Sequence, residues 1–229
     1  MKITFMGHAS FRIEIEDQVL LIDPWLTGNP VLPADDHAAA TAGATHILIS
    51  HGHFDHAGDA LALSKSLNAP LVGLFDMMAY FEEQGAATIG YNRGGTVKLG
   101  GVDVSLVNAV HSSVLKTDKG PITFAAESGF MIKGEGHMIY FSGDTDVMAD
   151  MEWFGDYYKP DIGILSAGGH FTMDMDKTAY AAKKYFDFKT LIPCHYKTFP
   201  ILEQSAEALI KALPKVNVIE PEVMKTIEI

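Results

Sequence analysis

Seven side chains suited to metal binding occur at four widely separated places in this chain of 229 residues. They are His51, His53, Asp55, His56, His111, Asp144 and His195. Each place directly follows a short apolar run, so each is expected at or just after the end of a buried strand. Loops at one edge of a rigid scaffold can assemble a site from residues that are distant in sequence. The chain must therefore fold so that four strand ends meet.

The pattern of apolar residues predicts strands in blocks, with helices after each block, instead of a strict alternation of strand and helix. Residues 3–22 contain three short alternating segments, and residues 45–50 form a compact run that ends at the histidine cluster. A hairpin is expected over residues 122–132 and 137–141. This order predicts an α+β fold with a two-layer β core and helices outside it.

One domain is expected over residues 1–229, made of two similar halves. The halves are about residues 1–120 and 121–229, with the metals between them. A chain of this length is long enough to bury a large core. With 48% hydrophobic and 20% charged residues, the composition is that of a globular protein.

Several properties limit the compartment and the partners. No apolar run approaches the roughly 20 residues of a transmembrane helix, and the N-terminal segment lacks the apolar stretch of a secretory signal. The single cysteine, Cys194, cannot form an internal disulfide. We therefore expect a cytoplasmic protein without membrane contact. The net charge of −12 disfavours nucleic acid as a partner, because phosphate contacts need clustered Lys and Arg. A small-molecule substrate and a homo-oligomer are both compatible with the sequence.

Short motifs around the candidate ligands resemble those of the metallo-β-lactamase superfamily. They are Gly7-His8-Ala9-Ser10, Leu21-Ile22-Asp23-Pro24, Val110-His111-Ser112-Ser113, Gly143-Asp144-Thr145 and Pro193-Cys194-His195-Tyr196. The resemblance covers the chain from Met1 to about Pro200, and it is to a group of cytoplasmic metal-dependent hydrolases in that superfamily. It implies a four-layer αββα sandwich, in which two β-sheets are flanked by helices.

The resemblance also implies how two divalent metal ions are held. The first ion is expected on His51, His53 and His111, and the second on Asp55, His56 and His195. The carboxylate of Asp144 is expected to bridge them, and Asp55 and Asp144 are the carboxylates expected to take part in catalysis. Imidazole nitrogen and carboxylate oxygen suit zinc, the first expectation, and also manganese, nickel or iron.

Four further residues are candidates for supporting roles. Asp23 is expected to accept a hydrogen bond from a ligand histidine, as ligand histidines commonly need; a turn-capping aspartate is the alternative. His8 and His170 lie in glycine-flanked loops and are candidates for proton transfer or substrate contact, against a purely structural role. Tyr196 is a candidate for a polar contact at the pocket, with packing as its alternative. Cys194 is expected to be a buried, inert thiol.

These observations favour a metal-dependent hydrolase that uses a metal-bridging hydroxide on a small ester, lactone or amide. A phosphodiesterase or nuclease is the alternative, because the same pair of ions would serve it. A metal-binding protein without catalysis is a third reading, which the complete ligand series disfavours.

Overall fold

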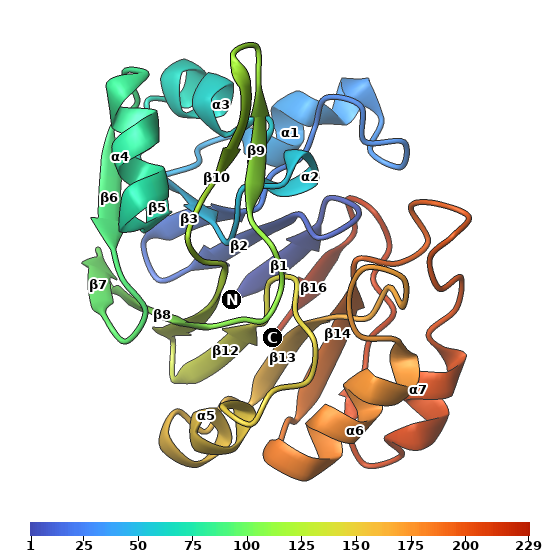
Figure 1. The fold of residues 1–229 in the computed structure, drawn as a ribbon. Coiled ribbons are helices and arrows are strands. Elements are labelled where there is room, and N and C mark those ends of the chain that lie inside the picture. Colours follow the sequence, from blue (N-terminus) through green and yellow to red (C-terminus); the bar gives the residue numbers. More distant parts are fainter.

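The computed structural model covers residues 1–229 and shows two seven-stranded sheets packed face to face between two helical layers (Figure 1). This is the predicted αββα sandwich. None of the helices combines the length and the hydrophobicity needed to cross a lipid bilayer.

The first sheet is mixed, and it is built mainly from the N-terminal part of the chain. Its strands, in spatial order, are β16 (Thr226–Glu228), β1 (Lys2–Phe5), β2 (Phe11–Ile15), β3 (Gln18–Ile22), β4 (His46–Ile49), β5 (Leu71–Leu74) and β6 (Thr88–Tyr91). The pairs from β16 to β3 are antiparallel, whereas β3 to β6 run parallel. Buried residues alternate along β2, as expected of a strand with one face toward the core. The outer face of this sheet is covered by η1 (Ala34–Asp36), α1 (His37–Thr41), α3 (Ala60–Leu67) and α4 (Phe75–Glu83).

The second sheet follows the same plan from the other part of the chain. Its strands, in spatial order, are β15 (Asn217–Val218), β14 (Thr190–Cys194), β13 (Ile162–Ser166), β12 (His137–Phe141), β11 (Ser128–Gly134), β8 (Val102–Asn108) and β7 (Thr96–Leu99). The parallel strands β13 and β14 are buried at every position, because helices cover their outer face. Those helices are α5 (Met151–Tyr157), α6 (Met175–Tyr185) and α7 (Glu207–Ala212).

Two buried clusters hold the layers together. A cluster of 39 residues fills the space between the sheets and beneath the first helices, and a cluster of 20 residues lies under α5 to α7. Phe11 on β2 meets Phe141 on β12 with ring centroids 6.2 Å apart, which joins the two sheets directly. Apolar packing of this kind is the main source of the stability of the sandwich.

Two details differ from the sequence-based prediction. The expected strand over 122–132 is divided: β10 (Gly120–Thr123) pairs with β9 (Val114–Thr117) in a separate hairpin, and only β11 pairs with β12. The predicted halves do not coincide with the sheets either. Both β7 and β8 precede residue 120 yet belong to the second sheet, and the C-terminal β16 returns to the first.

Candidate metal centre

The first group of candidate ligands lies where β4 and β8 end. His51 and His53 follow β4, and His53 directly precedes the short helix α2 (Phe54–Ala57). The nitrogens of His51, His53 and His111 all lie within 4.8 Å of one another. Nε2 of His51 is 3.0 Å from Nδ1 of His53, while Nδ1 of His51 hydrogen-bonds Oγ of Ser50 at 3.0 Å. The bond to Ser50 fixes the His51 ring so that its Nε2 faces the group.

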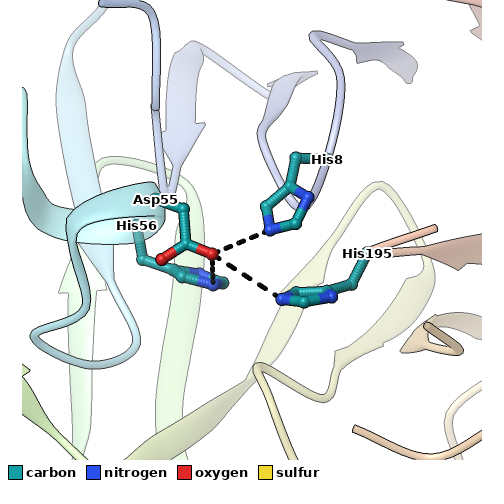
Figure 2. Close-up of side chains that lie close together, drawn as sticks. All are labelled: His8, Asp55, His56 and His195. Carbon is teal, nitrogen blue, oxygen red and sulfur yellow. Dashed lines mark hydrogen bonds and ion pairs between the residues drawn. The ribbon is translucent and has the colours of Figure 1, made fainter. Parts of the chain in front are cut away.

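The second group gathers around one oxygen of Asp55, in the first turn of α2 (Figure 2). Oδ2 of Asp55 lies 3.7 Å from Nε2 of His56 and 3.8 Å from Nε2 of His195. His8, in the loop between β1 and β2, reaches the same oxygen at 2.8 Å. Three imidazoles from different parts of the chain therefore converge on a single carboxylate oxygen.

Asp144 lies between the two groups. Its Oδ2 is 3.9 Å from Nε2 of His51 and 3.5 Å from Nε2 of His111, both in the first group. The same oxygen is 3.4 Å from Nε2 of His56 and 3.0 Å from Nε2 of His195, both in the second group. A carboxylate that faces nitrogens of both groups is in the position of a bridge between two cations.

Several donor atoms of these residues are buried without a hydrogen-bond partner, as expected of atoms that bind a metal ion. Nε2 of His56 and Oδ1 of Asp144 are buried without any hydrogen-bond partner, although buried polar atoms are nearly always paired. Burial opposes ionisation of Asp144, yet the adjacent His195 and His56 hold its pKa well below the usual value. Burial also lowers the pKa of His51 well below its usual value, which keeps the ring neutral as a metal ligand requires. These unpaired donors and ionised carboxylates would be satisfied by divalent cations.

Asp23 supports the candidate ligands through hydrogen bonds. Its Oδ2 accepts a hydrogen bond from Nδ1 of His56 at 2.8 Å, and its Oδ1 accepts one from the backbone N–H of Ser50 at 2.7 Å. The hydroxyl of Ser50 donates to Asp23 Oδ2 and also contacts His51. The fully buried carboxylate of Asp23 therefore orients His56 directly and His51 through Ser50, so it supports both groups.

The structure places the remaining candidates in different surroundings. His170 is exposed and packs edge-on against Phe171. Tyr196 is buried in the core under α6 and α7, which agrees with the packing alternative. Cys194 is buried in the core between the sheets, and burial raises the pKa of its thiol well above the usual value. His8 is completely buried, and its donor atom lies within 4.8 Å of those of Asp55, His56 and His195.

Sequence reasoning overlooked three contributors to the centre. Ser50 precedes the histidine cluster and links Asp23 to His51. Thr198 hydrogen-bonds Nδ1 of His8 at 3.0 Å. Gly168 lies so close to His195 that a Cβ atom would be 2.2 Å from the carbonyl oxygen of His195. Only the Gly168-Gly169 pair carried a signal in the sequence, as a loop that permits close backbone approach.

Comparison with known proteins agrees with this geometry. The family model described as "Beta-lactamase superfamily domain" matches residues 2–195. The chain belongs to the metallo-β-lactamase superfamily. It is 67% identical over 230 residues to a UPF0173 metal-dependent hydrolase of Dinoroseobacter shibae, with 100% of each chain covered. It is accordingly a member of the UPF0173 group and a metal-dependent hydrolase.

Solved structures give the same fold. A metallo hydrolase from the archaeon Ignicoccus hospitalis is 30% identical, with a TM-score of 0.84 over 100% of this chain and 98% of that one. An isothiocyanate hydrolase from Delia radicum gut bacteria shares the fold at 16% identity, with a TM-score of 0.74 over 100% of this chain and 99% of that one. The sandwich is thus the fold of this superfamily.

Proposed function

We propose that this protein hydrolyses a small cytoplasmic ester, lactone or amide at a centre of two divalent metal ions, with zinc as the preferred metal. The observation that carries the proposal is the position of Asp144 Oδ2, within 3.0–3.9 Å of histidine nitrogens from both groups. The first ion would be held by His51, His53 and His111, and the second by Asp55, His56 and His195. Asp144 would contact both.

Bound ions of this kind supply a hydroxide nucleophile near neutral pH and a positive contact for the substrate oxygen, since zinc lowers the pKa of bound water from 15.7 to about 7. The protein supplies imidazoles and three carboxylates, those of Asp55 and Asp144 and that of Asp23 behind His56. Two divalent ions would bring four positive charges against these three negative ones and would place positive charge beside the substrate oxygen. Such a centre stabilises the anion that develops on a carbonyl oxygen during hydrolysis.

Most of the candidate ligands are buried, and aromatic side chains lie beside them. Side-chain exposure is 14% for His111 and 12% for Asp55, while His51, His56, Asp144 and His195 are at 2% or less. Phe54, between two ligands, is 49% exposed. Its ring is 5.6 Å from that of Trp25, which in turn lies 6.0 Å from Phe199. Phe54 is the exposed member of this aromatic group, and its ring supports a substrate with an apolar body next to the bond that is cleaved.

The test is hydrolysis by metal-depleted protein reloaded with zinc or with manganese. Aryl esters and lactones would be compared with bis-p-nitrophenyl phosphate as a phosphodiester probe. We expect ester or lactone turnover that depends on added metal and that Asp144→Ala abolishes. Asp146→Ala is a matched control, because this aspartate is two residues away and exposed. Turnover of the phosphodiester alone would replace the proposal with a phosphodiesterase, and full activity of Asp144→Ala would reject the centre.

A further inference from the structure

His8 occupies a position that catalysis at the metals does not by itself explain. Its ring is completely buried, and both ring nitrogens are hydrogen-bonded. Nε2 meets Oδ2 of Asp55 at 2.8 Å, and Nδ1 meets Oγ1 of Thr198 at 3.0 Å. His8 comes from the loop after β1, Asp55 from α2, and Thr198 from the segment after β14. This chain of bonds joins residues that are 190 positions apart in sequence.

We propose that His8 and Thr198 are a positioning pair that orients the carboxylate of Asp55 and thereby sets the affinity of the second metal group. This inference rests on the proposed two-ion centre and adds to it two residues that do not touch the ions. Carboxylates that bind metals are themselves commonly held by further hydrogen bonds, and loss of such a bond typically weakens metal binding by about 10–100-fold.

The hydrogen bonds have one consistent direction. An ionised carboxylate only accepts, so Nε2 of His8 carries the proton and donates it to Asp55. Nδ1 of the neutral ring is then an acceptor, and the hydroxyl of Thr198 donates to it. Oγ1 of Thr198 also lies 3.3 Å from the carbonyl oxygen of Tyr196, a longer contact than the one to His8. Thr198 therefore selects the tautomer of His8 that can hold Asp55.

His8 lies beside the second group, with its donor atom within 4.8 Å of those of Asp55, His56 and His195, but it does not face Asp144. Oδ2 of Asp144 lies within 4.0 Å of nitrogens of His51, His56, His111 and His195, and His8 is not among them. Within the second group, the side chain of His8 hydrogen-bonds only Asp55, and aromatic rings lie against the other parts of its ring. The ring centroids of Trp25 and Phe199 are 5.3 and 5.8 Å away from that of His8. A hydrogen bond in such apolar surroundings is stronger than one in water.

The backbone of His8 supports the same group. Its carbonyl accepts a hydrogen bond from the N–H of His195 at 2.6 Å, and the two rings are 3.9 Å apart. Both residues have left-handed backbones, with φ of 59° at His8 and 60° at His195. Such conformations are costly outside glycine and persist where surrounding contacts enforce them. One residue thus holds one ligand through its side chain and another through its backbone.

The test is titration of metal-depleted protein with Zn²⁺ against a chelating dye, which gives a separate affinity for each ion. Wild type should bind two ions. Thr198→Val should weaken binding of the second ion about tenfold and leave the affinity for the first ion unchanged. Thr198→Ser keeps the hydroxyl, so its affinities should match those of wild type. His8→Asn is chosen because Asn tolerates the left-handed backbone, and it should weaken binding of the second ion more than Thr198→Val does. Thr178→Val is the control, because Thr178 is a buried threonine in α6 that bonds only backbone carbonyls.

The most stringent test is whether the effects of the two substitutions on metal affinity add. If Thr198 acts only through His8, the double variant His8→Asn with Thr198→Val should bind the second ion no more weakly than His8→Asn alone. X-ray absorption of the two-zinc protein should count five imidazoles, and a count of six would make His8 a ligand and overturn the inference. Additive losses, or wild-type affinity in Thr198→Val, would also overturn it. A wild type that binds no Zn²⁺ would instead overturn the proposed centre itself.

Discussion

Replacing Gly168 by alanine should damage the proposed metal centre without replacing any of its ligands. A Cβ atom at this position would lie 2.2 Å from the carbonyl oxygen of His195 and 2.9 Å from its Nδ1. Gly168 is also held in place, since its N–H donates to Thr172 Oγ1 at 3.1 Å and its carbonyl accepts from the N–H of Glu203 at 2.9 Å. His195 must therefore move by about 1 Å to restore normal contact in this close-packed interior.

The size of the effect follows from that displacement. Overpacking of this kind costs about 1–3 kcal/mol of unfolding free energy. Displacing His195 by about 1 Å should weaken binding of the second ion by at least tenfold. Loss of a hydrogen bond that supports a metal ligand has an effect of about this size. Chelator competition would measure metal affinity, and urea unfolding of the metal-free protein would measure stability.

A matched variant separates the two effects. At Gly155, in α5, a Cβ atom would lie 1.8 Å from the carbonyl oxygen of Tyr185, so alanine there should destabilise the fold comparably. Gly155 lies in the helical layer, away from the metal ligands, and metal affinity should stay at the wild-type value. Wild-type metal affinity in Gly168→Ala, or an equal loss of affinity in both variants, would refute the reasoning.

Three further outcomes are expected. Metal removal should lower the melting temperature, because free ion at 100 times its Kd stabilises a protein by about 2.7 kcal/mol; equal melting temperatures in calorimetry with and without chelator would contradict this. His170→Ala should leave metal content and turnover within about twofold of wild type, because this histidine is exposed, and a tenfold loss in either would contradict the assignment. Burial opposes ionisation of Asp161, but hydrogen bonds from the N–H of Met138 and the ring of His137 outweigh it and lower the pKa of this carboxyl below its usual value. The ionised form therefore stabilises the fold above about pH 4, and this contribution is lost as the pH falls through the folded pKa. The stability difference between wild type and Asp161→Asn, measured by urea unfolding, should shrink between pH 7 and pH 3, and a constant difference would exclude the ionised carboxylate as its source.

The proposed ligand residues could be singled out because local sequence carries their signal. Each follows an apolar run, and a strand that is buried along its length can place polar side chains only at its ends. His51, His53, Asp55 and His56 are adjacent in sequence, so their proximity needs no knowledge of the tertiary fold. The layers of the sandwich were predictable for the same reason, because the period of apolar residues is local.

The supporting contacts could not be predicted, because they depend on tertiary distances. Nothing in the residues around Thr198 indicates that its hydroxyl meets His8. Gly168 matters because its backbone passes beside His195, which is a property of two parallel strands, β13 and β14, and not of either alone. The error at residues 122–132 has another cause. The turn at Asp118-Lys119-Gly120 signals a hairpin, but the strands are too short for periodicity to separate them from the strand that follows.

Each of the two proposed metal groups draws its residues from both sheets, so neither sheet could form a complete group alone. In the first group, His51 and His53 follow β4 of the first sheet, and His111 follows β8 of the second. Apolar packing holds the sheets together but is not directional, so it does not fix their relative position closely enough for metal ligands. Directional bonds cross between the sheets at the centre itself.

Two sets of these bonds lie at the ends of the strands that carry ligands. Both the N–H and the hydroxyl of Ser128, on β11, donate to the carbonyl of Ser50 at 3.1 and 2.9 Å. The N–H of His195, after β14, donates to the carbonyl of His8 at 2.6 Å. Ser50 and His8 belong to the first sheet and its loops, and each orients a metal ligand through its side chain. The contacts that align the two sheets are therefore made by the same residues that aim the ligands, so an error in docking the sheets would appear first as a loss of metal affinity.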